Sequence, residues 1–195
     1  MQDRHTVEEE IFTHEYLWRS SIALADIVKS TKATSHHLII PALVMTLMAF
    51  EAFVNFCGFV LLPDVWMNEK EEFQGKGIEG KLTAIDGRLP KFEWCKGKDP
   101  YQSVKQLFKL RDLVAHGKVY ANTYHPQRDE DPRDYRWNHP WDTYLTPESV
   151  VKAREDVRSF CQSVIVAMRD ESDHLHLIHD AFTGPLASGI GHRTI

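Results

Sequence analysis

The feature that most constrains the fold is one long apolar stretch, residues 38–62, which by its length alone could cross a membrane. Glu51 and Asn55 lie near its middle, and a carboxylate at the centre of a bilayer costs about 2.5–3.5 kcal/mol. No Lys or Arg lies immediately beside either end of the stretch. We therefore expect a buried central helix of a soluble protein, starting near Pro41 and ending before Pro63, and no membrane partner.

Apolar residues recur every three or four positions in four other segments, and this spacing predicts four further helices. His14 falls on the apolar stripe of the first helix and is expected in the core. Thr146 is the expected N-cap of the last helix, and Gly117 is the expected C-terminal cap of the helix before it. The sequence thus predicts an all-α fold, an antiparallel bundle of four to five helices. The four segments are residues 7–28, 78–89, 100–116 and a long last helix that starts at Pro147.

The 195 residues are about the length of one domain, and 43% of them are apolar, which is enough for a hydrophobic core. Residues 119–147 interrupt the helical pattern with four of the nine prolines and six aromatic residues. Loops of this length inside a domain are usually functional or mobile. We expect one domain over residues 1–183, with this aromatic and proline-rich insertion before the last helix, and a flexible tail over residues 184–195.

The cysteines and the N-terminus predict a cytoplasmic protein. Cys57, Cys95 and Cys161 are odd in number and form no CxxC pair, so they favour a reducing compartment over a disulfide framework. Residues 1–10 are acidic and do not have the basic and apolar pattern of a secretion signal.

Charge is distributed unevenly along the chain. The whole chain has a formal charge of −5, yet residues 88–118 contain eight basic and three acidic residues. A basic segment on an acidic body is what a phosphate-binding surface needs, although a solvated helix face with its connecting loop has the same composition. We expect Lys105, Lys109 and Lys118 to contact RNA phosphates if the surface is functional.

Arg111, Asp112 and His116 lie within this basic segment, at the end of a predicted helix. Asp112 and His116 are four residues apart and share a helix face, so the carboxylate can orient or charge the imidazole. Arg111 is rotated about 140° from His116 on an ideal helix. A second copy of the helix across a two-fold axis would bring an arginine and a histidine together more naturally, which predicts a homodimer.

The segment LRDLVAHG, residues 110–117, resembles the Arg-x(4–6)-His signature of the HEPN superfamily. The resemblance includes MAFEAFVN, residues 48–55, and EGKL, residues 79–82. It implies an all-α domain that acts as a metal-independent endoribonuclease, usually a homodimer with both motifs in one cleft. It also implies a place in toxin–antitoxin or defence systems, with a possible antitoxin protein as a partner. No cofactor and no metal ligand are expected.

The residue types suit RNA cleavage. His116 has a side chain that titrates near neutral pH and can act as the general base toward a 2′-hydroxyl. Arg111 can stabilise the negative phosphorane without a metal. Glu51 has an apolar surround and should need a cation to stay charged, and Arg111 is the candidate. Asn55, one turn from Glu51 on the same helix face, is expected to support the same pair.

Other interpretations of these residues stay open. The chain could be a non-catalytic HEPN module that binds RNA, a nucleotide or a protein, or a structural helical dimer in which Arg111 only pairs with Glu51. The aromatic residues of 119–147 could stack on RNA bases or merely pack the loop. Arg169 and His174 repeat the motif spacing among acidic residues that would repel a phosphate. A cluster of three histidines near the C-terminus has a ligand-like spacing but is typical of a solvated helix end: His174, His176 and His179.

Overall fold

The computed structural model describes residues 12–31, 36–117, 141–171 and 180–182. In these residues the chain forms α-helices, one short 3₁₀ helix and no strand, so the all-α prediction is confirmed. The sequence predicted helices that correspond to α1, α2, α5, α6 and α7 of the structure. The predicted tail and most of the predicted insertion lie outside the described residues.

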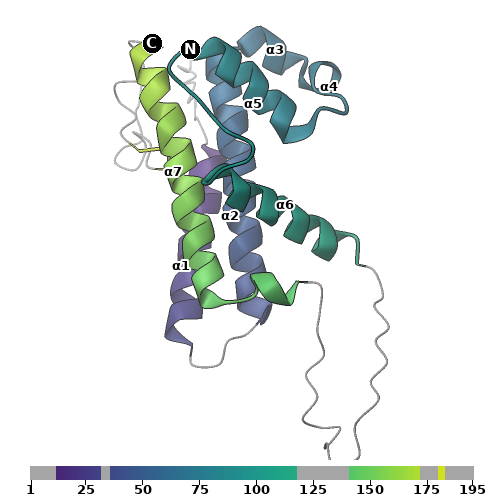
Figure 1. The fold of residues 1–195 in the computed structure, drawn as a ribbon, viewed down its shortest axis with the longest axis vertical. Coiled ribbons are helices and arrows are strands. Elements are labelled where there is room, and N and C mark those ends of the chain that lie inside the picture. Colours follow the sequence, from purple (N-terminus) through teal and green to yellow (C-terminus); the bar gives the residue numbers. More distant parts are fainter. Residues whose placement is uncertain (1–11, 32–35, 118–140, 172–179, 183–195) are drawn as a thin grey trace, which may run out of the picture.

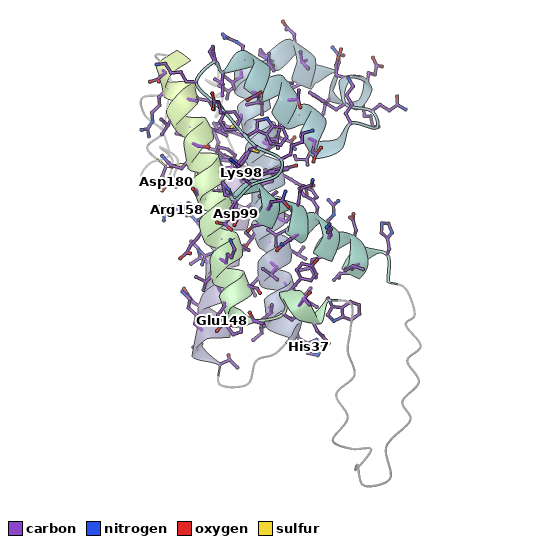
Figure 2. All side chains as sticks on the ribbon, viewed as in Figure 1. His37, Lys98, Asp99, Glu148, Arg158 and Asp180 are labelled. Carbon is purple, nitrogen blue, oxygen red and sulfur yellow. The ribbon has the colours of Figure 1, made fainter. Side chains whose placement is uncertain are left out.

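The long apolar helix α2 (His36–Leu61) lies at the centre, and α1 (Thr13–Ser30) and α7 (Pro147–Glu171) run beside it (Figure 1). His37 and Glu148 lie at the same end of the molecule, so α2 and α7 run in the same direction, whereas α1 runs opposite to α2 (Figure 2). The predicted antiparallel arrangement therefore holds for α1 and α2 but not for α2 and α7, which several helices separate along the chain. Phe50 and Phe53 of α2 are fully buried, and Phe50 meets the ring of Phe160 on α7 edge to face. The core is therefore built around α2.

Helix α2 begins earlier than the sequence indicated. Pro41 was expected near the start of the helix, but it lies inside the helix, five residues after His36. A proline at this position removes one intrahelical hydrogen bond and crowds the carbonyl four residues earlier, but the added turn buries Ile39 completely. Among the described helices, α2 alone is long and apolar enough to cross a membrane, with a mean hydropathy of 1.9 over a window that is 50% buried.

The chain after α2 makes two short helices that the sequence did not reveal, α3 (Pro63–Met67) and α4 (Glu69–Glu72), before α5 (Gly77–Arg88). Pro63 begins α3 rather than only ending α2, because proline is well suited to the first helical position. Gly75 and Gly77 have φ values of 70° and 55°, which allow the turn into α5. Leu82 and Ile85 are buried where α5 packs against α2.

Helix α6 (Tyr101–Ala115) crosses the central helices and then projects away from them (Figure 1). Its first half is anchored by the buried side chains of Tyr101, Val104 and Leu107, whereas most of its last turn is exposed. Gly117 follows with a φ of 43°, so the predicted C-terminal glycine is confirmed. This arrangement presents the end of α6, which bears the Arg-x4-His motif, to solvent.

The segment before α6 is tied to α7. Asp99 lies beside α7 (Figure 2), and its carboxylate accepts a hydrogen bond from Lys152 at 3.1 Å. The helix α7 begins as predicted, because the Thr146 hydroxyl accepts a hydrogen bond from the backbone N–H of Ser149 at 3.1 Å. A short 3₁₀ helix, η2 (Asp142–Tyr144), precedes α7 in the part of the predicted insertion that is described.

His14 is buried, as predicted, with 5% of its surface exposed. Its ring packs among aromatic side chains, 5.8 Å from Phe53, 4.8 Å from Phe56 and 6.3 Å from Phe182, measured between ring centroids. Burial lowers the pKa of His14 from 6.5 to about 4, because the apolar surround disfavours the imidazolium. His14 is thus a neutral core residue at pH 7.

Candidate functional site

Arg111 on α6 is held by two carboxylates. Its Nη1 donates a hydrogen bond to Glu51 Oε1 at 2.9 Å, which brings together two residues that are 60 positions apart. Its Nε and Nη2 both donate to Asp112 Oδ1, at 3.2 and 3.0 Å. The cation that Glu51 was expected to need is therefore Arg111. The pair stays open to solvent, since the side chains of Arg111 and Glu51 are 38% and 33% exposed.

The guanidinium also lies over an aromatic ring. The Cζ atom of Arg111 is 5.0 Å from the ring centroid of Phe108, one turn earlier on α6. A cation over a ring face is attracted by the ring quadrupole, and an arginine held in this way loses rotamer freedom. Together with the two carboxylates, the ring fixes where the positive charge lies.

Asp112 does not contact the His116 imidazole, contrary to the role expected for it. Its carboxylate is bonded to Arg111, and only its backbone carbonyl meets His116, accepting the backbone N–H at 3.1 Å. The neighbouring arginine, with a planar array of N–H donors, is the stronger partner for a carboxylate than a neutral imidazole. His116 is the C-cap residue of α6, and its side chain is exposed.

Asn55 lies one turn after Glu51 on α2, but its partner, Lys81, was not predicted from the sequence. Its Oδ1 accepts a hydrogen bond from Lys81 Nζ at 2.7 Å, and Lys81 also pairs with Glu69 of α4. The side chain of Lys81 is only 14% exposed. The sequence does contain a signal for this contact. Lys81 lies on the apolar stripe of α5 between Ile78 and Leu82, where a buried lysine needs polar partners.

A cleft of about 710 Å³ lies between these elements. Three of the five predicted catalytic residues line it, Glu51, Asn55 and Arg111, whereas Asp112 and His116 do not. The lining of the cleft combines three cationic side chains with two carboxylates and two aromatic rings, so it offers both charged and apolar surface. Its lining comes from α2, the α4 region, α5 and α6: Glu51, Asn55, Glu69, Lys70, Phe73, Gly77, Ile78, Lys81, Phe108 and Arg111.

The basic segment is partly neutralised by acids from other elements. Glu79 of α5 pairs with Lys96 at 2.9 Å and lies 3.8 Å from Lys105, which is 41% exposed. The hydrogen bond from Lys96 and the positive charges of Lys96 and Lys105 lower the pKa of Glu79. Lys109 is exposed and makes no ion pair with the described residues, while Lys118 lies outside them.

Within the described residues, no group of three or more histidine, cysteine, aspartate or glutamate side chains is arranged to hold a metal ion. His174, His176 and His179 lie outside those residues. Cys57, Cys95 and Cys161 are free thiols, and burial raises the pKa values of the Cys57 and Cys161 thiols well above their usual range. Neither buried thiol is suited to be a nucleophile.

Comparison of the chain with models of protein families, with curated proteins and with solved structures finds no match. The function is therefore inferred from the residues of this chain and from their geometry.

Proposed function

We propose that this chain is a metal-independent endoribonuclease of the HEPN type, which cleaves RNA through the 2′-hydroxyl next to the broken bond. The observation that carries the proposal is the exposed end of α6, where Arg111 is fixed at the edge of an open cleft and His116 follows in the next turn. This pairs a permanent cation with an imidazole that can accept a proton, and both are within reach of a ligand from solvent.

In the proposed reaction, His116 takes the proton from the 2′-hydroxyl, and the 2′-oxygen attacks the adjacent phosphorus. The bond from phosphorus to the 5′-oxygen breaks, and that oxygen takes up a proton to leave as a 5′-hydroxyl. The other product is a 2′,3′-cyclic phosphate. Arg111 stabilises the phosphorane, whose charge is greater than that of the substrate phosphate, so its contribution is largest in the transition state.

The hydrogen bonds of Arg111 leave room for a phosphate. A guanidinium has five N–H groups, and three of them are engaged by Glu51 and Asp112. One N–H on Nη1 and one on Nη2 have no partner among these two carboxylates and can bind two phosphate oxygens. Glu51 would then act as a positioning residue, which holds the guanidinium without preventing it from binding RNA.

We further propose that the working form is a homodimer in the cytoplasm, with an antitoxin as a possible partner. Arg111 and His116 point to different sides of one helix, so a second copy is needed to focus both on one phosphate. Val114 lies between them and is 38% exposed, which gives the end of α6 an apolar surface for contact with another chain. Lys109, two residues before Arg111 on α6, is still proposed to contact an RNA phosphate.

A non-catalytic module is the second candidate, and one observation favours it. The charge of Arg111 is already matched by Glu51 and Asp112, as it would be in a purely structural pair. Such a protein could bind RNA, a nucleotide or a protein partner, or form a structural helical dimer, without cleaving anything.

Analysis of the reaction products separates the two candidates. Purified protein incubated with single-stranded RNA should give fragments that end in a 2′,3′-cyclic phosphate and begin with a 5′-hydroxyl. A 2′-deoxy substitution at the cleaved nucleotide should block the reaction, and EDTA should not, because no metal takes part. Intact RNA after long incubation, or cleavage that EDTA stops, would refute the proposed chemistry.

A further inference from the structure

The cleft beside Arg111 has the size of a site for a small ligand. Its volume of about 710 Å³ falls within the 300–1,000 Å³ or so that is usual for such sites. Arg111 and Glu51 form one part of its wall, so the cleft is continuous with the proposed position of the scissile phosphate. A ligand in the cleft would therefore be attached to that phosphate or lie next to it.

The cleft offers aromatic surface to a flat ligand. Phe73, at the end of α4, and Phe108 of α6 both line it, and each is partly exposed. Phe73 is supported from behind by the ring of Trp66, with 4.8 Å between the ring centroids. Rings that are held in place and reachable from solvent are the surfaces on which nucleic-acid bases stack.

The polar part of the cleft has a fixed pattern of donors and acceptors. Lysine can only donate hydrogen bonds, so the bond from Lys81 Nζ at 2.7 Å identifies the Asn55 oxygen and leaves the Asn55 amide N–H₂ for a ligand. Glu51 binds Arg111 through Oε1, which leaves Oε2 to accept a hydrogen bond from a ligand, one helical turn from Asn55. Glu69 adds a second carboxylate to the lining.

We infer that this cleft binds a nucleobase with an exocyclic amino group, adjacent to the phosphate at Arg111. A base ring suits Phe73, since one face of Phe108 is already covered by the Arg111 guanidinium, and the ring acceptor of the base suits the Asn55 amide. An amino group is the complement of a carboxylate oxygen, as in contacts between glutamate and cytosine, whereas the carbonyl of uracil would be repelled by it. The inference rests on the proposed function, because the adjacent phosphate is the one to be cleaved.

Binding of mononucleotides to the intact protein tests the inference without any cleavage. AMP and CMP are compared with purine riboside 5′-monophosphate and UMP, which lack the amino group, and with ribose 5-phosphate, which lacks a base. Titration calorimetry should show AMP binding about tenfold or more tightly than ribose 5-phosphate, as expected for one stacked base. AMP and CMP should also each bind severalfold more tightly than the matched nucleotide without the amino group.

Two matched variants locate the site. Phe73→Leu keeps an apolar side chain against Trp66 but removes the stacking surface, and it should lower AMP affinity to the level of ribose 5-phosphate. Phe59→Leu, at a position that is 62% exposed on α2 and does not line the cleft, should leave AMP affinity unchanged. The nucleotide series needs no variant, so it decides the matter even if Phe73→Leu unfolds.

The outcomes distinguish this inference from the proposed function. If the protein cleaves RNA but binds all five ligands alike, the inference is wrong and the proposed function stands. If AMP and CMP are preferred and Phe73→Leu removes the preference, while RNA stays intact, the base site stands and the nuclease proposal fails.

Discussion

Arg111 and Glu51 are joined at 2.9 Å between α6 and α2, so the cation of the Arg-x4-His motif is bonded to the carboxylate that interrupts the apolar central helix. The pair is about one-third exposed on both sides, and ion pairs of this kind contribute little to stability. Its main consequence is geometric. The pair holds the guanidinium at the edge of the cleft, and it can therefore be tested separately from the fold.

Glu51→Gln keeps the shape of the side chain but weakens its hold on Arg111. We expect kcat for RNA cleavage to fall about tenfold, equivalent to about 1.4 kcal/mol of transition-state stabilisation, while KM falls or stays constant because a carboxylate has been removed. The melting temperature should change by only a few degrees. An unchanged kcat would show that the ion pair does not position a group that acts in the reaction.

Asp112→Asn should tighten RNA binding, because it removes a negative charge that is bonded to Arg111 and competes with phosphate. We expect the affinity for RNA to increase about two- to fivefold at 50 mM salt. This increase should become smaller as the salt concentration rises, because the Asp112 side chain is 56% exposed and its charge is screened. Fluorescence anisotropy with a 2′-deoxy oligonucleotide measures this effect. Glu148→Gln, at the start of α7 (Figure 2), is the control and should have no effect. Weaker binding by Asp112→Asn would mean that Asp112 supports the site rather than opposing the phosphate.

Gly58 of α2 lies against the indole of Trp66, and a β-carbon added there would lie 2.0 Å from the ring. Gly58→Ala should therefore destabilise the protein by about 1–3 kcal/mol or more, because the buried Trp66 ring has to move. Gly87→Ala on α5 is the matched control, since a β-carbon there meets no atom within 4 Å. It should stabilise the protein by about 0.4–1 kcal/mol. Thermal unfolding of both variants checks the packing of α2 against α3, and equal melting temperatures would contradict it.

His14 should make stability depend on pH. Its pKa is about 4 in the folded protein against 6.5 for an ordinary histidine, so between these values the unfolded chain binds a proton that the native protein does not. The contribution of His14 is complete above about pH 6.5 and is lost as the pH falls toward 4, by roughly 3 kcal/mol in total. Urea unfolding across this pH range should show that the free energy of unfolding falls more steeply with decreasing pH in the wild type than in His14→Phe. Parallel pH profiles would place His14 in a solvated site.

Periodicity and helix-end chemistry predicted most of the helices, because these signals are local. The bounds of α6 differ from the prediction by one residue at each end, Gly117 follows the C-cap residue His116 with a positive φ, and Thr146 caps α7 as expected. Pro41 was misplaced because burial of Ile39 outweighs the local preference of proline for the first turn. The short helices α3 and α4 are too brief for a periodic pattern.

The sequence predicted the contact of the candidate site for which electrostatics allows one partner. It did not predict the contacts for which several partners compete. A carboxylate in the apolar stretch needs a cation, so the pairing of Glu51 with Arg111 could be expected. Asp112 had two possible partners, Arg111 and His116, and spacing alone does not rank them. Lys81 reaches Asn55 only because α5 packs against α2, and that tertiary contact has no local signature.

The most direct test of the account is the single-turnover rate of RNA cleavage by His116→Ala. The rate should fall about 10²–10⁴-fold with the loss of the general base, and Arg111→Ala should cost about 10²–10³-fold with the loss of the phosphorane stabiliser. His37→Ala, an exposed histidine at the far end of α2 (Figure 2), should cleave at the wild-type rate. Cleavage by His116→Ala at the wild-type rate would contradict the account, because the general base would then lie elsewhere in the chain.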